Sequence, residues 1–439
     1  MRKLVALASL LAFSSSLTAA ALSSGAPSFA RSKTYRTGRL PESVAIGDLN
    51  RDGKPDVAVA NELAKSVSVL LNRGNGSFGP KVDYRTGILP NSVAIGDLNG
   101  DGKPDLATTN GLDAGTVSVL ANRGDGTFGR HVEHAVGGEP ASVAIGDLNG
   151  DGRPDLATTN AGADTVSVLL NNGDSSFQGK HDYLVGNGPY SVALGNLNGD
   201  GRPDVATANS SDDTISVLLN RGDGTFQGKR DYGIGLGVGS VAVGDLNGDG
   251  KSDLAATSGS STASVLLNKG DGSFRGSREY RTAFAPYSVA IGDLNGDGKP
   301  DLAIANGHPT NSVSVLVNRG NGRFLPNVDY RTGRGSSSVA IGDLNGDGKS
   351  DLATANGRAN TVSVLINAPG LCTVQNVEGK RLSVAKRVIA RANCRVGKTR
   401  RANSKAVERG RVISQKPRPG TVLPSGGKVE LVASKGPRR

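Results

Sequence analysis

The chain contains 439 residues, of which 63 are glycine, none is tryptophan and 36% are hydrophobic. Glycine and proline together stay below the share that marks low-complexity chains, so the composition excludes a disordered protein and allows a packed core. The formal net charge is +11, which taken alone would indicate a nucleic-acid partner.

Residues 1–21 have the tripartite pattern of a secretory signal peptide. Met1 to Lys3 is basic, Leu4 to Phe13 is apolar, and small residues follow up to Ala21. The apolar run is too short to span a bilayer. A buried strand or helix is the alternative interpretation. We expect cleavage after Ala21, a secreted protein and no transmembrane segment.

Seven copies of one unit fill the chain between residues 26 and 368. The segment S-V-A-I-G-D-L-N-G-D-G-K-P-D-L-A recurs with small changes every 48–50 residues. In the second copy, turn residues separate four short runs that are typical of strands, at residues 92–97, 105–110, 116–122 and 127–135. Seven repeats of four strands predict an all-β fold, a seven-bladed β-propeller.

The two ends of the repeat region predict ring closure. Each complete repeat ends with Phe and, six residues later, Tyr or His, but the seventh repeat stops at Asn367 without this segment. The missing pair, Phe29 and Tyr35, stands at the start of the mature chain. We therefore expect the N-terminal strand to complete the last blade, which would remove exposed sheet edges.

Each repeat also carries an acidic loop of the form D-x-N-x-D-G-x-x-D after its first strand. Oxygen side chains at alternate positions, with a glycine for the turn, are what Ca²⁺ requires. The sequence predicts up to seven calcium sites of structural type; metal-free turns are the alternative. Asn196 replaces Asp in the fourth loop, which should bind most weakly. The candidate ligands are Asp48, Asn50, Asp52, Asp56, Asp97, Asn99, Asp101, Asp105, Asp147, Asn149, Asp151, Asp155, Asn196, Asn198, Asp200, Asp204, Asp245, Asn247, Asp249, Asp253, Asp293, Asn295, Asp297, Asp301, Asp343, Asn345, Asp347 and Asp351.

These repeats resemble the FG-GAP (VCBS-type) repeats, the family that includes the seven-bladed propeller of integrin α chains. Phe78-Gly79 and Phe128-Gly129 keep the Phe-Gly pair of that family. The resemblance implies calcium in the loops of one face and a ligand surface on the other. The family contains adhesion proteins, lectins and some glycan-active enzymes, so the fold does not fix the function.

Residues 371–436 form a second, basic module. Leu382, Ala385, Ile389 and Ala392 have helical spacing, and residues 411–415 and 428–434 are typical of strands. The module resembles a PASTA domain in segments such as Gly410-x-Val412-Ile413-Ser414-Gln415-x-Pro417, and the resemblance implies binding to peptidoglycan or another cell-wall polymer.

The two cysteines of the chain, Cys372 and Cys394, both lie in this small module. They predict a disulfide, because a domain of this size has a limited core and a secreted protein meets an oxidising compartment. A reactive thiol or a metal pair is the alternative.

Neither part of the chain presents an evident catalytic group. Only four histidines are present, His131, His134, His181 and His308, and no single repeat carries an outlying cluster of polar residues that could assemble a catalytic triad. The best ligand-binding candidates of the propeller are Tyr190 and Tyr287, at equivalent positions in two repeats, where they could stack on sugars or cover a blade junction.

The charge is unevenly divided between the two parts. Residues 371–439 contain 18 Lys and Arg against three Glu, whereas the acidic loops make the rest slightly negative. This distribution, with the signal peptide, argues against nucleic acid. We expect a secreted, bacterial, non-enzymatic adhesion or glycan-binding protein, tethered to the cell wall by its C-terminal module. The alternatives are a soluble lectin and a calcium-dependent polysaccharide lyase or hydrolase.

Overall fold

The computed structural model describes residues 25–111, 115–367, 372–392, 394–423 and 427–437. The predicted signal peptide, residues 1–21, lies outside the described residues. The chain folds into two compact units, one spanning Phe29–Asn367 and another that contains Ala368–Arg439. In the described part of the chain, no helix is both long and apolar enough to cross a membrane.

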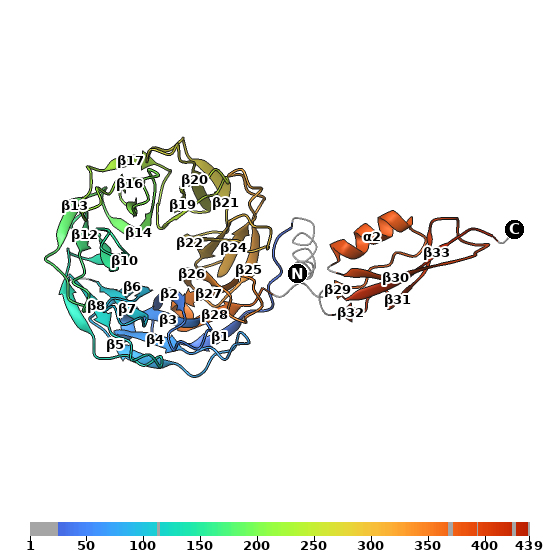
Figure 1. Cartoon of the computed structure of the whole chain (residues 1–439), viewed down its shortest axis with the longest axis horizontal. Helices are drawn as coiled ribbons and strands as arrows, with labels where there is room; N and C mark the ends of the chain where they lie inside the picture. The colour runs from blue at the N-terminus through green and yellow to red at the C-terminus, as the bar shows by residue number, and fades with distance from the viewer. Residues whose placement is uncertain (1–24, 112–114, 368–371, 393, 424–426, 438–439) are drawn as a thin grey trace, which may run out of the picture. The chain divides into compact units, whose positions relative to one another are not determined.

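The first unit consists of seven four-stranded antiparallel sheets arranged in a ring (Figure 1), which confirms the predicted propeller. The first strand of each sheet lies nearest the axis. It is built from small residues because neighbouring blades approach closely here; a Cβ on Gly47, for example, would lie 3.1 Å from the Ile95 side chain. The inner strands are β2 (Pro41–Gly47), β6 (Pro90–Gly96), β10 (Pro140–Gly146), β14 (Pro189–Gly195), β18 (Val241–Gly244), β22 (Pro286–Gly292) and β26 (Ser336–Gly342).

A ring of serine hydrogen bonds joins these inner strands. The Val93 N–H donates to Ser43 Oγ at 3.2 Å, from the second blade to the first. The same bond recurs at each junction and closes where the Val44 N–H donates to Ser338 Oγ at 3.3 Å. The repeated serine therefore links the blades to one another, a role that composition alone did not indicate.

The two middle strands of each sheet are almost wholly buried, because the core lies between adjacent sheets. In one such core, Leu49 and Val67 of the first blade pack with Leu106 and Phe128 of the second. The second strands are β3 (Asp56–Asn61), β7 (Asp105–Asn110), β11 (Asp155–Asn160), β15 (Asp204–Asn209), β19 (Asp253–Ser258), β23 (Asp301–Asn306) and β27 (Asp351–Asn356). The third strands are β4 (Ser66–Leu70), β8 (Thr116–Leu120), β12 (Thr165–Leu169), β16 (Thr214–Leu218), β20 (Thr262–Leu266), β24 (Ser312–Leu316) and β28 (Thr361–Leu365).

The outer strands are short and exposed. They are β1 (Lys33–Arg36), β5 (Val82–Arg85), β9 (Val132–Ala135), β13 (His181–Leu184), β17 (Arg230–Gly233), β21 (Arg278–Arg281) and β25 (Val328–Arg331). The prediction that one strand runs through residues 127–135 was wrong: Phe128 forms an isolated bridge to Asn122, and the ladder resumes at Val132. The polar segment between them leaves the ladder.

Ring closure occurs as predicted. Strand β1 pairs antiparallel with β28, with Tyr35 opposite Val362, and Phe29 bridges Asn367. The Phe and Tyr residues contact each other between blades and not within one repeat. Tyr35 meets Phe78 edge-to-face with ring centroids 5.3 Å apart, and Phe29 meets Tyr330 at 4.9 Å, so an aromatic pair lies at each junction.

The C-terminal unit contains helix α2 (Leu382–Arg391) and a three-stranded sheet of order β30 (Arg395–Ala402), β33 (Lys428–Ser434), β31 (Val412–Lys416). A two-stranded sheet joins β29 (Cys372–Thr373) to β32 (Val422–Leu423). The predicted helix and two strands are present, and β30 is an additional strand. Among its described residues, the propeller also contains the 3-10 turns η1 (Glu62–Ala64) and η3 (Gly357–Ala359).

Candidate functional site

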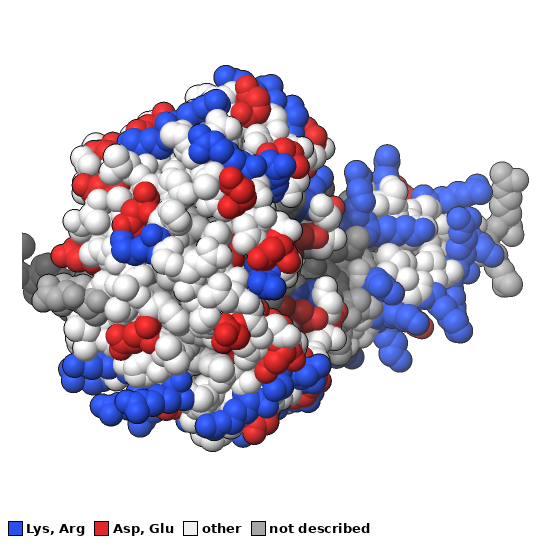
Figure 2. All heavy atoms as spheres, turned by 60° about the vertical axis from the view of Figure 1, so that its left-hand side comes forward, with Lys and Arg blue, Asp and Glu red and all other residues white. Residues whose placement is uncertain are grey.

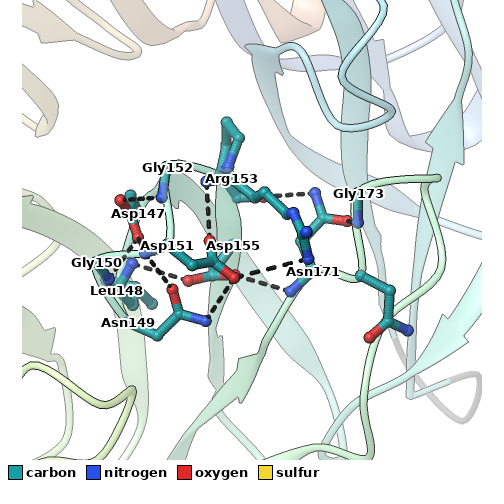
Figure 3. Close-up of polar contacts among 12 residues, drawn as sticks. Asp147, Leu148, Asn149, Gly150, Asp151, Gly152, Arg153, Asp155, Asn171 and Gly173 are labelled. Atoms are coloured by element: carbon teal, nitrogen blue, oxygen red, sulfur yellow. Dashed lines mark hydrogen bonds and ion pairs between the residues drawn. The ribbon is translucent and has the colours of Figure 1, made fainter.

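Each acidic loop directly follows an inner strand. Within a loop, the oxygens of the Asp and Asn side chains accept hydrogen bonds from backbone N–H groups of the same loop, as Figure 3 shows for the third loop. Asp147 Oδ1 accepts the Asp151 N–H at 3.2 Å, and Asn149 Oδ1 accepts the same N–H at 2.9 Å. Asp147 Oδ2 accepts from the Gly152 N–H at 2.8 Å. The first and third residues of the loop therefore place their oxygens close together.

The sixth loop residue is glycine in all seven loops, which suits its left-handed backbone; Gly152, for example, has φ = 81°. The fourth position is also left-handed, and six of the loops have glycine there. Arg51 takes this position in the first loop with φ = 60°. The first loop therefore holds a non-glycine residue in a conformation that costs free energy.

The last acidic residue of each loop is buried, and it has a structural role that sequence reasoning missed. Asp155 Oδ2 accepts from the Leu148 N–H at 2.8 Å, and Oδ1 accepts from the Asn171 N–H at 2.7 Å. The same arrangement surrounds Asp105. Burial raises the pKa of the Asp105 carboxyl to about 6, although its two backbone hydrogen bonds act to lower it. This carboxylate ties the acidic loop to the end of the third strand.

A buried asparagine continues this connection into the preceding blade. Asn171 Nδ2 donates to Pro154 O in its own blade and to Leu98 O in the preceding blade, both at 2.8 Å. Its Oδ1 accepts from the Gly173 N–H at 2.8 Å. The recurrence of N-x-G before Phe in six of the repeats was the available sequence signal. The seven equivalents are Asn72, Asn122, Asn171, Asn220, Asn268, Asn318 and Asn367.

The exposed side chains of the loops are of the kind that binds calcium, since their ligand atoms are carboxylate and amide oxygens. Basic neighbours compete for some of these atoms: Lys103 Nζ lies 3.0 Å from Asp101 Oδ2. Among the described residues, no three His, Cys, Asp or Glu side chains form a group that could hold a metal ion. The two exposed Asp of a complete loop would therefore need Asn and backbone oxygens to complete a cation site.

The fourth loop differs as its sequence suggests. Asn196 Oδ1 accepts from the Gly199 N–H at 2.8 Å, and its amide group cannot supply the second acceptor oxygen that Asp147 offers. The loop therefore has one negative charge fewer. The expectation that it binds calcium most weakly stays a prediction.

The two candidate tyrosines lie on the face opposite the acidic loops. Tyr190 follows Pro189 and Tyr287 follows Pro286, where the pairing register of each inner strand shifts. Their side chains are 52% and 54% exposed. Each ring is therefore about half covered, and both interpretations, stacking on a sugar and covering a blade junction, stay predictions.

The remaining candidates lie apart from both groups. His134 occupies the tyrosine position of its repeat and packs edge-to-face on Phe177 at 4.8 Å, whereas His131 Nε2 lies 3.4 Å from Glu133. Cys394 is 5% exposed in the core of the C-terminal unit. The backbone of Cys372 pairs with Leu423, but its side chain is outside the described atoms, so the disulfide stays a prediction.

The ring of four-stranded sheets defines the first unit as a β-propeller in which every blade is built from a copy of the same sequence repeat. The model for the FG-GAP-like repeat matches residues 48–108, 97–158, 147–207, 196–256, 245–304 and 293–354, and the PASTA domain model matches residues 373–435. The chain therefore belongs to the FG-GAP-like repeat family and carries a C-terminal PASTA domain. No curated protein matches the chain.

Solved structures share the propeller fold at low sequence identity. BBS1N in complex with ARL6DN is 12% identical with a TM-score of 0.54, over 77% of this chain and 96% of that one. A catalytically inactive virginiamycin B lyase from Staphylococcus aureus is 13% identical with a TM-score of 0.52, over 77% and 99%. An Agrocybe aegerita lectin that recognises terminal N-acetylglucosamine is 21% identical with a TM-score of 0.47, over 68% and 80%. These likenesses concern the fold alone.

Proposed function

We propose that this chain is a secreted, non-enzymatic binding protein whose propeller contacts a glycan or protein ligand while its PASTA domain holds it on cell-wall polymers. The separation of charge carries the proposal. Residues 371–439 contain 18 Lys and Arg against three Glu, and the preceding residues contain 33 against 37 acidic residues. A localised positive charge attracts an anionic polymer, whereas a balanced surface does not.

Four of the basic residues of the PASTA domain lie on one edge strand of its sheet. Strand β30 is an outer strand of its sheet, and it exposes Arg395, Lys398, Arg400 and Arg401. In Figure 2, Lys and Arg crowd the visible surface of this domain, whereas both signs are mixed on the visible surface of the propeller. Phosphate or carboxylate groups of a wall polymer would find several cations along one strand.

Calcium ions in the acidic loops form part of the proposal. The first, third and fifth residues of each loop would hold the ion, as Asp147, Asn149 and Asp151 would in the third loop. The convergence of Asp147 Oδ1 and Asn149 Oδ1 on one N–H supports this assignment. Bound calcium would neutralise the loop carboxylates and stiffen the turn.

A disulfide between Cys372 and Cys394 would stabilise the PASTA domain outside the cell. A bridge over a loop of this length contributes roughly 3 kcal/mol. The buried position of Cys394 suits a structural bond better than a reactive thiol.

A wall-binding assay with the full chain tests the proposal. The variant Lys398→Glu/Arg400→Glu/Arg401→Glu reverses three exposed charges of β30. The matched control, Arg85→Glu/Arg281→Glu/Arg331→Glu, reverses three exposed charges on outer propeller strands.

We expect the β30 variant to lose at least tenfold in sedimentation with isolated cell walls, and the propeller control to bind normally. Binding of the natural chain should also weaken as salt is raised, since salt screens exposed charges. Equal binding by the natural chain and the β30 variant would reject the tether.

A further inference from the structure

The outer strands of the propeller differ in charge around the ring. We define the outer segment of a blade as its Phe and the ten residues after it. In four blades the outer segments contain 11 Lys and Arg against three Asp and Glu, whereas in the other three they contain four against three. The basic segments are residues 29–39, 78–88, 274–284 and 324–334, and the balanced segments are residues 128–138, 177–187 and 226–236. The positive charge of the rim is therefore concentrated in four of the seven blades.

Ring closure makes the four basic segments neighbours. Strand β1 completes the last blade by pairing with β28, so it lies between β25 of the sixth blade and β5 of the first. The outer strands β21, β25, β1 and β5 therefore follow one another around the ring (Figure 1). Edge-to-face ring contacts join each of these blades to the next, with centroids 4.9–5.3 Å apart; they are Tyr280–Phe324, Phe29–Tyr330 and Tyr35–Phe78. We call this continuous surface of four outer segments the basic arc.

One exposed arginine recurs in every blade of the basic arc. It directly follows the tyrosine of the outer segment, and the four examples are Arg36, Arg85, Arg281 and Arg331. The equivalent residues of the balanced segments are Ala135, Leu184 and Gly233. Among the described residues, Lys81 is the only one of the 11 basic residues of the arc that forms an ion pair with an acidic side chain. The arc therefore presents cations that are not paired with carboxylates of the protein itself.

The last blade also lacks an acidic residue that each of the other six has in its outer strand. Thr34 of β1 lies opposite Ser363 of β28. The equivalent residue of the first blade, Asp83, accepts a hydrogen bond from Ser68 Oγ at 2.6 Å and pairs with Lys81. The exchange of Asp for Thr removes this carboxylate from the last blade, whose outer segment contains four basic residues and no acidic one.

A groove lies at each end of the basic arc. One groove, of about 720 Å³, is lined by residues of the first and second blades, among them Arg85 and Arg130. The other, of about 750 Å³, is lined by residues of the fifth blade and of the connection that leads into it, among them Arg281 and Ser261. Arg85 and Arg281 are the terminal arginines of the arc, so its positive charge extends from one groove to the other.

Both grooves offer groups that recognise hydroxyls. Thr86 and Glu133 line the first groove, and Thr282 and Glu279 line the second. A hydroxyl can donate to a carboxylate and accept from a threonine hydroxyl. A ligand that carries both hydroxyls and negative charges therefore matches the grooves and the arc between them.

We propose that the basic arc binds a free, linear anionic polysaccharide whose chain follows the rim across four blades. This inference deepens the proposed function, because it rests on the propeller having a glycan ligand. Cations distributed over four blades attract a chain that has charges along its whole length. A small anion would meet only one or two of them, and a single exposed ion pair contributes little binding free energy.

The basic arc fits a polysaccharide better than a nucleic acid. Single-stranded nucleic acid binds by stacking its bases on exposed aromatic rings. Among the described residues of the arc, Phe284 is the one exposed ring, since the tyrosines pack against the Phe of the neighbouring blade. Duplex DNA, with a persistence length of about 50 nm, is too stiff to follow the curved rim.

A polymer anchored in the cell wall should depend on β30 and not on the basic arc. Strand β30 holds four exposed cations on one short strand, so a single stretch of an anchored chain can contact them together. The arc spreads its cations around a curved rim, and only a chain that is free to bend along the rim can contact them all. The two surfaces should therefore respond to different substitutions.

Fluorescence anisotropy with labelled polysaccharides tests the proposal. The probes are polygalacturonate, dextran sulfate and neutral dextran. The protein is the full chain with Lys398→Glu/Arg400→Glu/Arg401→Glu, so that β30 does not contribute. We expect both anionic probes to bind at least tenfold more tightly than dextran, and to bind more weakly as salt is raised.

Charge reversal in the basic arc should remove most of this affinity. The propeller control of the wall assay reverses three arginines of the arc, and here it serves as the arc variant; it should weaken both anionic probes at least tenfold. The matched control Lys180→Glu/Lys229→Glu/Arg230→Glu reverses three exposed charges of the balanced segments, and we expect less than a twofold change. Because both variants have the same net charge, their difference reports the position of the cations.

Two further variants alter the arc while following the repeat. Thr34→Asp restores the acidic residue of the other six blades, and Ser363 can donate to it as the equivalent serine does in the first blade. We expect a normal melting curve and at least threefold weaker binding. Gly233→Arg extends the arc into the fourth blade, where a Cβ meets nothing within 4 Å, and should strengthen binding. Leu184→Arg adds the same charge in the third blade, away from the arc, and should have a smaller effect.

Chain length and chain chemistry give the last readouts. Digalacturonate should bind at least tenfold more weakly than polygalacturonate, because it cannot cross several blades. Tighter binding of polygalacturonate than of dextran sulfate identifies a uronate polymer as the ligand, and the reverse order identifies a sulfated polymer. Both orders support an anionic polysaccharide.

Four results would overturn the proposal. They are equal binding of dextran and the anionic probes, equal losses in the arc variant and its matched control, equal binding of digalacturonate and polygalacturonate, and tighter binding of a DNA oligonucleotide than of either polysaccharide. Wall sedimentation depends on β30 and these probes depend on the arc, so failure of the tether and failure of the arc can be distinguished. Loss of wall binding by the arc variant would show that both surfaces share one ligand, which would reject a separate polysaccharide site.

Discussion

His134 and Ser175 depart from the repeat at the same blade junction. At other junctions a tyrosine hydroxyl donates to a glycine carbonyl, as Tyr232 Oη does to Gly272 O at 3.1 Å. Here His134 replaces the tyrosine and Ser175 replaces the glycine, with φ = 64°. In the described structure, His134 Nε2 and Ser175 Oγ are buried without a hydrogen-bond partner. The junction between the second and third blades is therefore weaker in polar contacts than its neighbours.

A third substitution makes room for Ser175. At the first junction, a Cβ on Gly126 would lie 2.7 Å from the Leu71 side chain. Ala121 stands at the position equivalent to Leu71 in the next blade, where the serine has a Cβ to accommodate. The exceptions at residues 121, 134 and 175 are therefore physically coupled.

Restoring all three repeat residues should stabilise the propeller. We expect Ala121→Leu/His134→Tyr/Ser175→Gly to raise the free energy of unfolding by about 1–3 kcal/mol, through a new hydrogen bond and relief of the positive φ. Ala121→Leu alone should destabilise by about 1–3 kcal/mol, because leucine would meet the serine side chain. Urea titration measures both, and additive effects of the three changes would contradict the coupling.

Asn171, which joins neighbouring blades, should contribute more to the stability of the propeller than Asn172, the next residue in the sequence. Asn171→Ala would leave Pro154 O and the Gly173 N–H without their partner and would remove one of the two donors to Leu98 O, so we expect a loss of about 2–4 kcal/mol in unfolding free energy. Asn172 bonds only locally to Ser176, and Asn172→Ala is the matched control, with an expected change below about 0.5 kcal/mol. Similar losses in both variants would refute the ring of asparagine contacts.

Glu42 should make propeller stability depend on pH. Its pKa is raised from 4.5 to about 7 in the folded protein, so folding favours its protonated form and stability falls as the pH rises from about 4.5 through 7. Glu42→Gln removes this loss, and we expect its advantage over the natural chain to grow by about 1–3 kcal/mol between pH 5 and pH 8. The buried loop aspartates are shared by both proteins and cancel in the difference.

Thermal unfolding at several pH values measures this effect. Glu139→Gln serves as the control on the same face, with a difference from the natural chain that does not change with pH. An advantage of Glu42→Gln that is the same at pH 5 and pH 8 would contradict the assignment.

Calcium should raise the melting temperature if it occupies the acidic loops. Ten millimolar CaCl₂ with a dissociation constant near 1 mM adds about 1.4 kcal/mol for each site, so the rise should reach several degrees. Asn196→Asp restores the first ligand of the fourth loop and should increase this rise. Calorimetry with CaCl₂, MgCl₂ and a chelator is the measurement, and identical melting in all three solutions would argue for metal-free turns.

The sequence predicted most of the fold because every blade repeats the same strands and turns. Closure by Phe29 and Tyr35 could be predicted from the offset of the repeat alone. The basic strand β30 was missed, since Arg395–Ala402 lacks alternation and pairs in parallel with the distant β33. The serine hydrogen bonds between inner strands could not be predicted, because Ser43 and Val93 are 50 residues apart and their pairing depends on how neighbouring blades pack. The structural role of the last loop aspartate was hidden for a similar reason: its partner Asn171 lies in the next hairpin turn.

The pairing of β1 with β28 imposes an order on folding. Lys33 pairs with Val364, so the last blade cannot form until nearly the whole repeat region has been synthesised, and until then the first strand lacks its partner. Contacts between such distant residues form late and slowly. The chain also leaves the ring at Asn367, beside this same strand pair. If the PASTA domain is held on a cell wall and the propeller on a ligand, as proposed above, mechanical tension would be applied first to the blade that closes the ring.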